Sequence, residues 1–202
     1  GKEVFAVEHL TTNRLKDISF HIRAGEVVGL FGLMGAGRSE IASCIVGMKY
    51  HQTSEMRING EKYVPVSPAN ALKHKITYVP AERKTDGLFL ALTVRENITI
   101  SNLDLFTKHG KMDLKKEKKI ADEWIKTLHV KTPKSETIIE SLSGGNQQKV
   151  AVAKSLITDP ELIILNEPTR GIDVSSADQR AGALHSGIES QWTACKIQSR
   201  SQ

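Results

Sequence analysis

One octapeptide in this chain combines the residue types that bind phosphate groups. Residues 32–39 read Gly-Leu-Met-Gly-Ala-Gly-Arg-Ser, one substitution away from the pattern G-x-x-x-x-G-K-[ST]. The glycines let backbone N–H groups turn toward an anion, and a helix that begins here would add the positive end of its dipole. Ser39 would offer its hydroxyl to Mg²⁺, while Arg38 places a larger, planar cation at the lysine position. The competing interpretation is a glycine-rich strand-to-helix turn with no ligand.

The residues on either side of this loop predict the elements that would position it. Residues 26–31 are mainly apolar and predict a buried strand, and residues 39–46 have the apolar spacing of a helix with one buried face. Gly47 follows as a helix stop. A strand, a glycine loop and a helix in this order give the motif its phosphate-binding geometry.

Two further stretches carry polar residues to places where ligands bind. Ser143-Gly144-Gly145 opens a predicted helix that runs to about Ile157, so that backbone N–H groups and a hydroxyl would form a second anion cradle. A capped helix after a flexible turn is the alternative. The apolar run 162–165 predicts a buried strand. This strand delivers Asn166 and Glu167 to its carboxyl end, the edge at which open α/β sheets bind ligands.

The remaining pattern predicts a mixed fold of strands and helices. Asn59-Gly60 predicts a hairpin turn, and Thr93 with Glu96 three residues later predicts a capping box. Phe5 and Trp124 are interpreted as core residues rather than as ligand-stacking ones. The other expected elements are strands at 4–7, 18–22 and 76–79, a short helix at 68–75, an exposed polar loop at 80–87 and a largely helical stretch from 88 to about 130.

The composition is that of an ordinary globular protein. Its 202 residues are enough for one domain with a subdomain, and the net charge of +5 suits an anionic ligand without indicating nucleic acid. Two cysteines, Cys44 and Cys195, give no disulfide framework and fit a reducing compartment. No apolar run approaches the ~20 residues of a membrane span. The chain begins with Gly1 rather than methionine, so we expect it to be a piece of a longer protein.

The three motifs, in this order, resemble those of ATP-binding cassette (ABC) ATPases. More narrowly, the chain is similar to the second cassette of the tandem ATPase subunits of bacterial sugar importers. Four segments carry this similarity: G-L-M-G-A-G-R, E-R-K-T-D-G-L, L-S-G-G-N-Q-Q-K-V and N-E-P-T-R-G-I-D. The resemblance covers roughly residues 1–174. It implies an α/β fold, a P-loop NTPase with an ABC-type antiparallel β subdomain and an inserted helical subdomain. The implied divisions are a core of residues 1–87 and 155–174, a helical subdomain of 88–154 with the signature motif, and an atypical tail of 175–202.

The same resemblance implies a role for each matching residue. The glycine loop would hold the phosphates of ATP, with Ser39 and Asn166 on Mg²⁺ and Glu167 as the general base that polarises the attacking water. The Ser143-Gly144-Gly145 turn would contact ATP held by a partner cassette, and Asp173 would lie at the seam between the two cassettes. The implied nucleotide-binding residues are Gly32, Gly35, Ala36, Gly37, Arg38, Ser39, Glu40, Ser143, Gly144 and Gly145.

The resemblance also implies partners and a location. A second ABC cassette, tandem or dimeric, would pair with this one head to tail, and residues 80–87 would contact membrane permease subunits. A sugar-binding protein would be an indirect partner, and nucleic acid would not be one. The cassette would act peripherally at the cytoplasmic face of the cell membrane. DNA-repair cassettes would carry a long coiled coil between the motifs, whereas the intervening stretch here lacks sustained heptads.

Three substitutions depart from the common cassette pattern. Arg38 replaces lysine, as it does in the sugar-importer second cassettes, and Ala81 stands where many cassettes carry a metal-contacting glutamine, with Glu82 beside it. Asn166 replaces the aspartate that supports Mg²⁺. A unit charge about 4 Å from another is worth at most about 4 kcal/mol at an effective dielectric of about 20, so weaker Mg²⁺ support is expected.

The tail is the largest departure. The family continues after Val174 with a helix and a further buried strand that ends in a γ-phosphate sensor. Residues 175–202 predict a helix at 177–184 but no strand, and His185 has no assigned role. We therefore expect a truncated or altered-frame, C-terminally incomplete cassette, whose unpaired apolar sheet edge would lower its solubility.

Two functions follow from the sequence. In the first, the chain is the ATP-binding and ATP-hydrolysing subunit of an ABC importer for a monosaccharide. In the second, Arg38, Asn166 and the missing strand impair its own site. The chain then binds nucleotide and completes the ATP site of a partner cassette through the Ser143-Gly144-Gly145 turn. The motif set favours the first function as the family identity, and the departures favour the second as the state of this chain.

Overall fold

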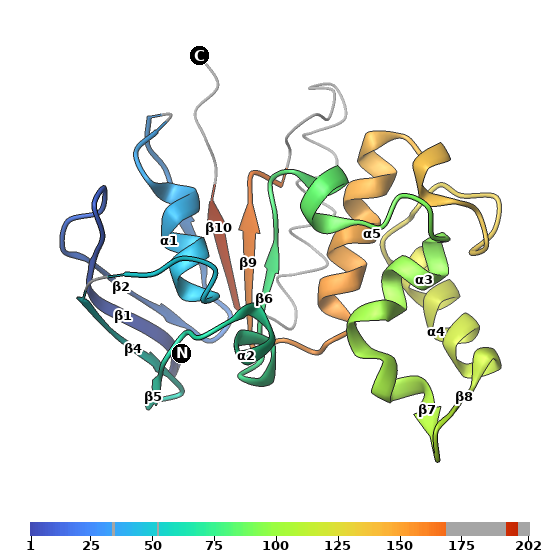
Figure 1. Ribbon diagram of the computed structural model, residues 1–202, viewed down its shortest axis with the longest axis horizontal. Coiled ribbons are helices and arrows are strands. Elements are labelled where there is room, and N and C mark those ends of the chain that lie inside the picture. The colour runs from blue at the N-terminus through green and yellow to red at the C-terminus, as the bar shows by residue number, and fades with distance from the viewer. Residues whose placement is uncertain (34, 52, 169–192, 198–202) are drawn as a thin grey trace. The chain divides into compact units, whose positions relative to one another are not determined.

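The computed structural model describes residues 1–33, 35–51, 53–168 and 193–197 (Figure 1). The chain divides into two compact units, which are described separately. The first unit holds the described residues within 1–78, residues 160–168 and the strand at 193–197, and the second holds residues 79–159. The domain boundaries expected from the sequence, at 87/88 and 154/155, stay a prediction.

Four strands of the first unit form an antiparallel sheet. They are β1 (Glu3–Thr11), β2 (Ile18–Arg23), β4 (Thr53–Ile58) and β5 (Glu61–Tyr63), in the order β2-β1-β4-β5. Asn59 and Gly60 connect β4 to β5 with φ angles of 52° and 84°, so the predicted hairpin is confirmed. Phe5 is fully buried, as expected of a core residue.

A second sheet follows the order β3-β10-β9-β6. Its strands are β3 (Val27–Leu30), β10 (Thr193–Ile197), β9 (Leu162–Asn166) and β6 (Ile76–Val79). All five residues of β9 are buried, which explains its continuous apolar run. Strand β3 leads into the glycine loop and β9 leads into Glu167, so both candidate segments follow the carboxyl ends of strands.

Strand β10 corrects the prediction for the tail. We expected residues 175–202 to contain no strand and to leave a sheet edge unpaired, but β10 lies between β3 and β9 and is parallel to both. The short segment Thr-Ala-Cys-Lys-Ile has little strand pattern of its own. Its conformation is set by the backbone groups of two neighbouring strands, which is a tertiary effect that outweighs local propensity. The predicted helix at 177–184, Asp173 and His185 lie outside the described residues.

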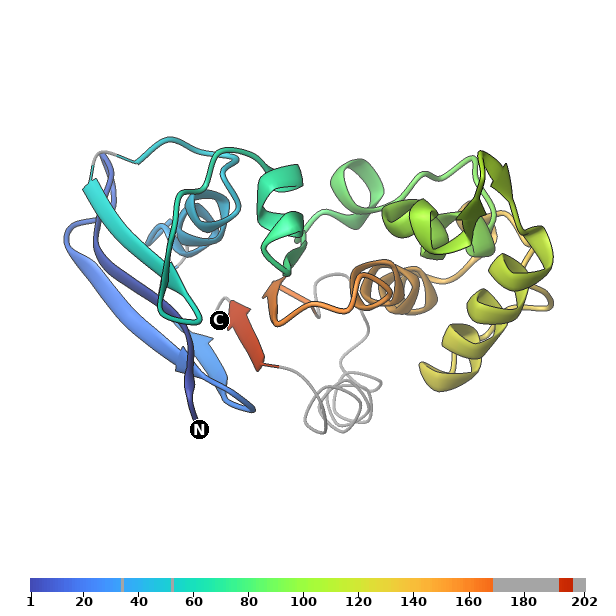
Figure 2. The ribbon, with the colours of Figure 1, turned by 90° about the horizontal axis from the view of Figure 1, so that it is seen from below.

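Helix α1 (Arg38–Ile45) packs in the core of the first unit. Its residues Ile41 and Ile45 share one apolar cluster with Phe5 of β1 and Ile164 of β9. In Figures 1 and 2, α1 lies on the side of the antiparallel sheet that faces β10 and β9. Gly47, with φ of 72°, follows the helix as predicted. A second helix, α2 (Pro68–Lys73), is capped by the side chain of Ser67, which accepts a hydrogen bond from the N–H of Asn70.

The second unit is mainly helical. It contains a π-helical turn η1 (Arg83–Gly87), α3 (Val94–Thr99), a 3-10 segment η2 (Ile100–Phe106), the short pair β7 (Thr107–Lys108) and β8 (Lys111–Met112), α4 (Leu114–Thr127), a 3-10 turn η3 (Ile139–Ser141) and α5 (Gly144–Leu156). The capping box at Thr93 and Glu96 is confirmed at the start of α3. Among the described helices, none is long and apolar enough to cross a membrane.

One prediction for the second unit is wrong in part. The polar segment 80–87 was expected to be an exposed loop, but its second half forms η1, in which Arg83 and Gly87 are buried. Gly87 is buried against neighbouring structure, because a Cβ built at this residue would lie 3.3 Å from Cγ of Pro80. Arg83 is only 9% exposed in the same turn, and its Nε is buried, which a count of polar residues does not reveal.

Candidate functional site

The glycine loop opens α1 in the geometry expected of an anion site. Gly35 and Gly37 have φ angles of 84° and 85°, in the left-handed region that other residues rarely adopt. A Cβ built at Gly37 would also lie 2.7 Å from Cδ2 of Leu15, so only glycine fits there. Gly37 is the N-cap of α1, and no side chain caps this helix. The N–H groups of Glu40 and Ile41 donate to the carbonyl of Gly37 at 3.0 and 3.1 Å, and no N-cap side chain competes for an anion at the start of the helix.

Arg38 folds back over the loop that precedes it. It is only 9% exposed, and a Cβ built at Gly32 would lie 3.7 Å from Cδ and 3.9 Å from Nε of Arg38. The guanidinium stem thus packs along the glycine loop, which keeps a permanent positive charge beside the proposed phosphate position.

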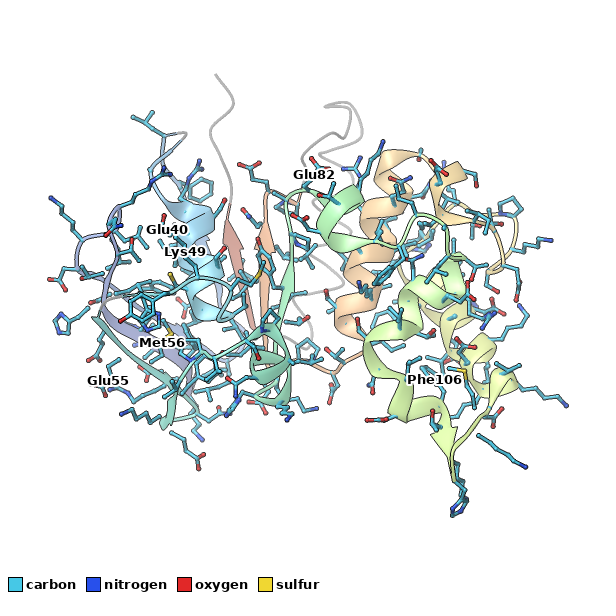
Figure 3. All side chains as sticks on the ribbon, viewed as in Figure 1. Glu40, Lys49, Glu55, Met56, Glu82 and Phe106 are labelled. Carbon is cyan, nitrogen blue, oxygen red and sulfur yellow. The ribbon has the colours of Figure 1, made fainter. Side chains whose placement is uncertain are left out.

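Glu40 uses its side chain for contacts inside the protein. Its carboxylate accepts a hydrogen bond of 2.6 Å from the hydroxyl of Thr12 and lies 2.9 Å from Nζ of Lys49. Figure 3 shows Glu40 and Lys49 next to each other at α1. Hydrogen bonds from Thr12 and Lys49 hold the pKa of the Glu40 carboxyl below its ordinary value. The N–H of Glu40 donates to the carbonyl of Gly37 at 3.0 Å, so the expected contact of Glu40 with phosphate stays a prediction.

Ser39 and Asn166 are brought together from positions 127 residues apart. The Ser39 hydroxyl donates to Oδ1 of Asn166 at 3.2 Å, and Nδ2 of Asn166 donates to the hydroxyl of Tyr78 at 3.0 Å. Asn166 is 3% exposed, so the bond to Tyr78 at the end of β6 turns the amide oxygen toward Ser39. Sequence reasoning missed Tyr78, although its position in the strand at 76–79 placed it on the same sheet.

Glu167 follows β9 with a strained backbone. Its φ of 45° lies in the left-handed region, which costs a residue other than glycine on the order of 1 kcal/mol. Such strain persists where the surroundings impose it, and it turns the chain sharply at the carboxyl end of β9. The side chain is half-buried, so it is accessible at the edge of the sheet where the glycine loop also begins.

The Ser143-Gly144-Gly145 turn belongs to the second unit. Ser143 is the N-cap of α5, which has no side-chain cap. The Ser143 hydroxyl accepts a hydrogen bond of 3.0 Å from Nδ2 of Asn146, whose Oδ1 accepts one of 2.9 Å from the N–H of Lys131. The turn is thereby fixed by the residue that follows it. Within the first unit the structure brings Ser39 next to Asn166, with Glu167 directly after it in the chain. Residues 143–145 belong to the second unit and form a separate candidate contact.

The residues of the first unit fit a magnesium nucleotide. The start of α1 offers uncapped N–H groups to phosphate, and the side of Gly35 where a Cβ would stand is open within 4 Å. Ser39 and Asn166 offer oxygen atoms, the ligand type that Mg²⁺ prefers. Within the described residues there is no cluster of three His, Cys, Asp or Glu side chains. A cation here would therefore depend on these two oxygens together with phosphate and water.

Curated relatives resemble the chain over most of its length. The ribose import ATP-binding protein of Clostridium tetani is 43% identical over 178 residues, which cover 87% of this chain and 35% of that protein. The protein of the same description from Bacillus subtilis is 42% identical over 177 residues, with coverage of 87% and 36%. The chain thus spans about a third of the length of these relatives.

Solved structures show the same fold at low sequence identity. The ADP conformation of MJ1267, described as an ATP-binding cassette of an ABC transporter, has a TM-score of 0.84 and 18% identity, and the match covers 100% of this chain and 83% of that one. The dimeric post-hydrolysis state of the ATP-binding cassette MJ0796, bound to ADP and Pi, has a TM-score of 0.77 and 22% identity, with coverage of 96% and 87%. The expected cassette fold is therefore confirmed.

The sequence also matches a family directly. Residues 15–170 match the family described as ABC transporter, a range that contains the glycine loop, the Ser143-Gly144-Gly145 turn and the end of β9. With this match and relatives above 40% identity, the chain belongs to the ABC transporter ATP-binding family.

Proposed function

We propose that the chain is a nucleotide-binding domain of an ABC importer for a monosaccharide, in which hydrolysis of ATP drives sugar uptake. The observation that carries the proposal is the pairing of Ser39 with Asn166 at 3.2 Å beside the uncapped start of α1. The relatives described as ribose import proteins support the transported class. ATP and Mg²⁺ are the proposed cofactors.

Each residue of the site has a proposed task in phosphoryl transfer to water. The loop 32–39 holds the phosphates through its N–H groups, and Arg38 balances their charge. Glu167 accepts a hydrogen bond from the attacking water and orients it. Mg²⁺, when bound by Ser39 and Asn166, supplies positive charge to the phosphate oxygens. Because this reaction depends mainly on positioning and charge stabilisation, the fixed geometry around Asn166 matters more than the chemical reactivity of any side chain.

The proposed partners follow from the family. A second cassette pairs head to tail with this one and receives the Ser143-Gly144-Gly145 turn. The segment 80–87 contacts the membrane permease, and a sugar-binding protein acts through that permease. The domain works peripherally at the cytoplasmic face of the membrane. The pairing is supported by the similar cassette MJ0796, whose structure is described as dimeric.

A second candidate function is favoured by Asn166 itself. A neutral amide at this position, held by Tyr78 at 3.0 Å, supports Mg²⁺ more weakly than a carboxylate does. The chain would then bind ATP without turning it over and would complete the site of its partner cassette. The two functions differ in turnover at this chain's own site and agree on nucleotide binding.

Turnover by the purified chain and by Glu167→Gln tests the proposal. If the first function is right, the wild-type chain hydrolyses ATP when Mg²⁺ is present, and Glu167→Gln binds ATP with similar affinity but loses at least about a hundredfold in rate. Binding without turnover in the wild type would favour the second function. Equal turnover in both proteins would contradict the role of Glu167.

A further inference from the structure

A turn of the antiparallel sheet holds the first turn of α1 at two points. The turn comprises residues 12–15 between β1 and β2. Its Leu15, which is 3% exposed, lies against Gly37, where a Cβ would come within 2.7 Å of the leucine side chain. Its Thr12 donates a hydrogen bond of 2.6 Å to Glu40 in the buried interior. These two contacts bracket Arg38 and Ser39.

The Thr12 hydroxyl is fully engaged in this arrangement. It accepts hydrogen bonds from the N–H groups of Arg14 at 3.1 Å and Leu15 at 3.0 Å, while its own proton is donated to Glu40. The N–H of Thr12 donates to the carbonyl of Leu15 at 2.9 Å, which closes the turn. One side chain, that of Thr12, therefore holds the turn together and makes the hydrogen bond that attaches it to α1.

Lys49 completes the surroundings of the buried carboxylate. The segment after Gly47 returns to α1, where the N–H groups of Met48 and Lys49 donate to the carbonyl of Ser43 at 2.8 and 3.2 Å. Nζ of Lys49 thereby reaches Glu40 at 2.9 Å (Figure 3). A carboxylate whose side chain is only 7% exposed is costly unless it is paired, and here Lys49 and the Thr12 hydroxyl pair it.

We propose that Thr12 and Glu40 are positioning residues that clamp the first turn of α1, so that Arg38 and Ser39 are held in the geometry that binds phosphate and Mg²⁺. The inference rests on the proposed function, because it concerns the same site. Pre-organised donors bind an anion without a reorganisation cost at the moment of binding. The clamp supplies this order from a strand turn that is distant in sequence from the glycine loop.

Thr12→Val tests the clamp, because it keeps the side-chain shape and removes the hydroxyl. Thr11→Val is the matched control, since Thr11 makes its hydrogen bonds to His9 and Asp17 and none to Glu40. Thr12→Ser restores the hydroxyl. Affinities for magnesium ATP and for inorganic tripolyphosphate are measured by calorimetry on the full chain, together with amide hydrogen exchange at residues 38–41.

The clamp predicts that Thr12→Val binds both ligands about tenfold more weakly, the cost of one hydrogen bond to a charged group. It also predicts faster exchange at residues 38–41, with wild-type values in Thr11→Val and Thr12→Ser. Glu40→Ala removes the acceptor and the buried charge together, and it is expected to reproduce the loss of affinity. This variant keeps the test valid if Thr12→Val unfolds.

Two results would overturn the clamp alone. The first is that Thr12→Val or Glu40→Ala leaves both the ligand affinity and the hydrogen exchange unchanged. The second is that Thr12→Ser loses as much ligand affinity as Thr12→Val, which would assign the effect to packing. A wild-type chain that bound neither ligand would overturn the proposed function, and the clamp with it. The two failures are therefore distinguishable.

Discussion

Asn166 is the residue on which the proposed chemistry of the site depends most. It is buried at the end of β9, and its Oδ1 accepts a hydrogen bond from the Ser39 hydroxyl. Its Nδ2 donates a hydrogen bond to Tyr78, which orients the amide. A carboxylate in the same place would accept from both hydroxyls, because each of its oxygens is an acceptor. The structure thus has room for a residue that carries one more negative charge.

Asn166→Asp is expected to strengthen Mg²⁺ support. With Ser39 and Tyr78 both able to donate to the new carboxylate, the variant gains charge without losing a partner. We expect the Mg²⁺ concentration that gives half-maximal turnover to fall about tenfold, which corresponds to about 1.4 kcal/mol of Mg²⁺ binding free energy. A magnesium titration of turnover measures this. A wild-type magnesium requirement in Asn166→Asp would show that Asn166 does not contact the cation.

Tyr63 is expected to make the free energy of unfolding fall at alkaline pH. Its buried hydroxyl donates to the carbonyl of Ile45 at 2.9 Å, and burial raises the pKa of Tyr63 to about 12. An unfolded tyrosine has a pKa of about 10, so the folded chain holds this proton more tightly. The resulting stability is complete below about pH 10 and is lost as the pH rises through the folded pKa.

Tyr63→Phe is therefore expected to lower the free energy of unfolding by about 1 kcal/mol at neutral pH. It is also expected to lose less stability than the wild type when the pH is raised. Urea unfolding at about pH 8 and about pH 11 compares the two proteins. Tyr50→Phe serves as the control, because Tyr50 is 84% exposed. An alkaline loss that is as steep in Tyr63→Phe as in the wild type would assign it to other groups.

Among the elements, α3 has the clearest local cause. Thr93 accepts a hydrogen bond of 3.2 Å from the N–H of Glu96, and Glu96 accepts one of 2.8 Å from the N–H of Thr93. These bonds satisfy two donors that the helix itself leaves without partners. The pattern is visible in four residues of sequence, and for that reason it could be predicted.

Thr93→Ala is expected to destabilise the second unit by about 1 kcal/mol. Because Thr93 hydrogen bonds hold the pKa of the Glu96 carboxyl below its usual value, this contribution is present above the ordinary glutamate pKa and disappears as the pH falls through the lowered one. Urea unfolding at neutral and acidic pH measures both effects, with the exposed Thr127→Ala as control. Equal destabilisation at both pH values would contradict the pH dependence.

The central position of β10 gives a second prediction about an element. Its residues Ala194 to Ile197 pair with Val27 to Leu30 on one side and with Ile163 to Asn166 on the other. Lys196→Pro removes a backbone donor from this interior strand and is expected to destabilise the first unit by about 1 to 3 kcal/mol, the cost of leaving a buried acceptor without its partner. Lys196→Thr keeps the N–H and is the control. A thermal transition unchanged by the proline would show that β10 is not paired in solution.

For the molecule as a whole, head-to-tail pairing predicts complementation between two defective chains. In the proposed arrangement, Glu167→Gln would impair the hydrolytic side of a site, and Gly144→Arg would block the turn that completes the partner's site. Each variant alone is expected to be inactive, while a mixture regains part of the turnover, because one of the two sites in a mixed pair is intact. A mixture as inactive as its components would contradict head-to-tail pairing between two copies of this chain.

The sequence was informative for most features that depend on neighbouring residues, although the local turn η1 at Arg83–Gly87 was missed. The glycine loop before α1, the hairpin at Asn59-Gly60 and the strand that ends at Asn166 all follow from local pattern and were predicted. Strand β10 was missed because its pairing is set by β3 and β9. The Thr12–Glu40 bond and the partnership of Tyr78 with Asn166 join residues 28 and 88 positions apart, and no short pattern encodes such contacts.

Binding of magnesium ATP to the wild-type chain tests the central claim most directly. Calorimetric titrations with and without Mg²⁺ are compared with those of Ser39→Ala, which removes the hydroxyl beside Asn166 and keeps the glycine loop. We predict saturable binding that Mg²⁺ strengthens in the wild type and does not strengthen in Ser39→Ala. No binding by the wild-type chain, or an equal effect of Mg²⁺ on both proteins, would contradict the assignment of this site.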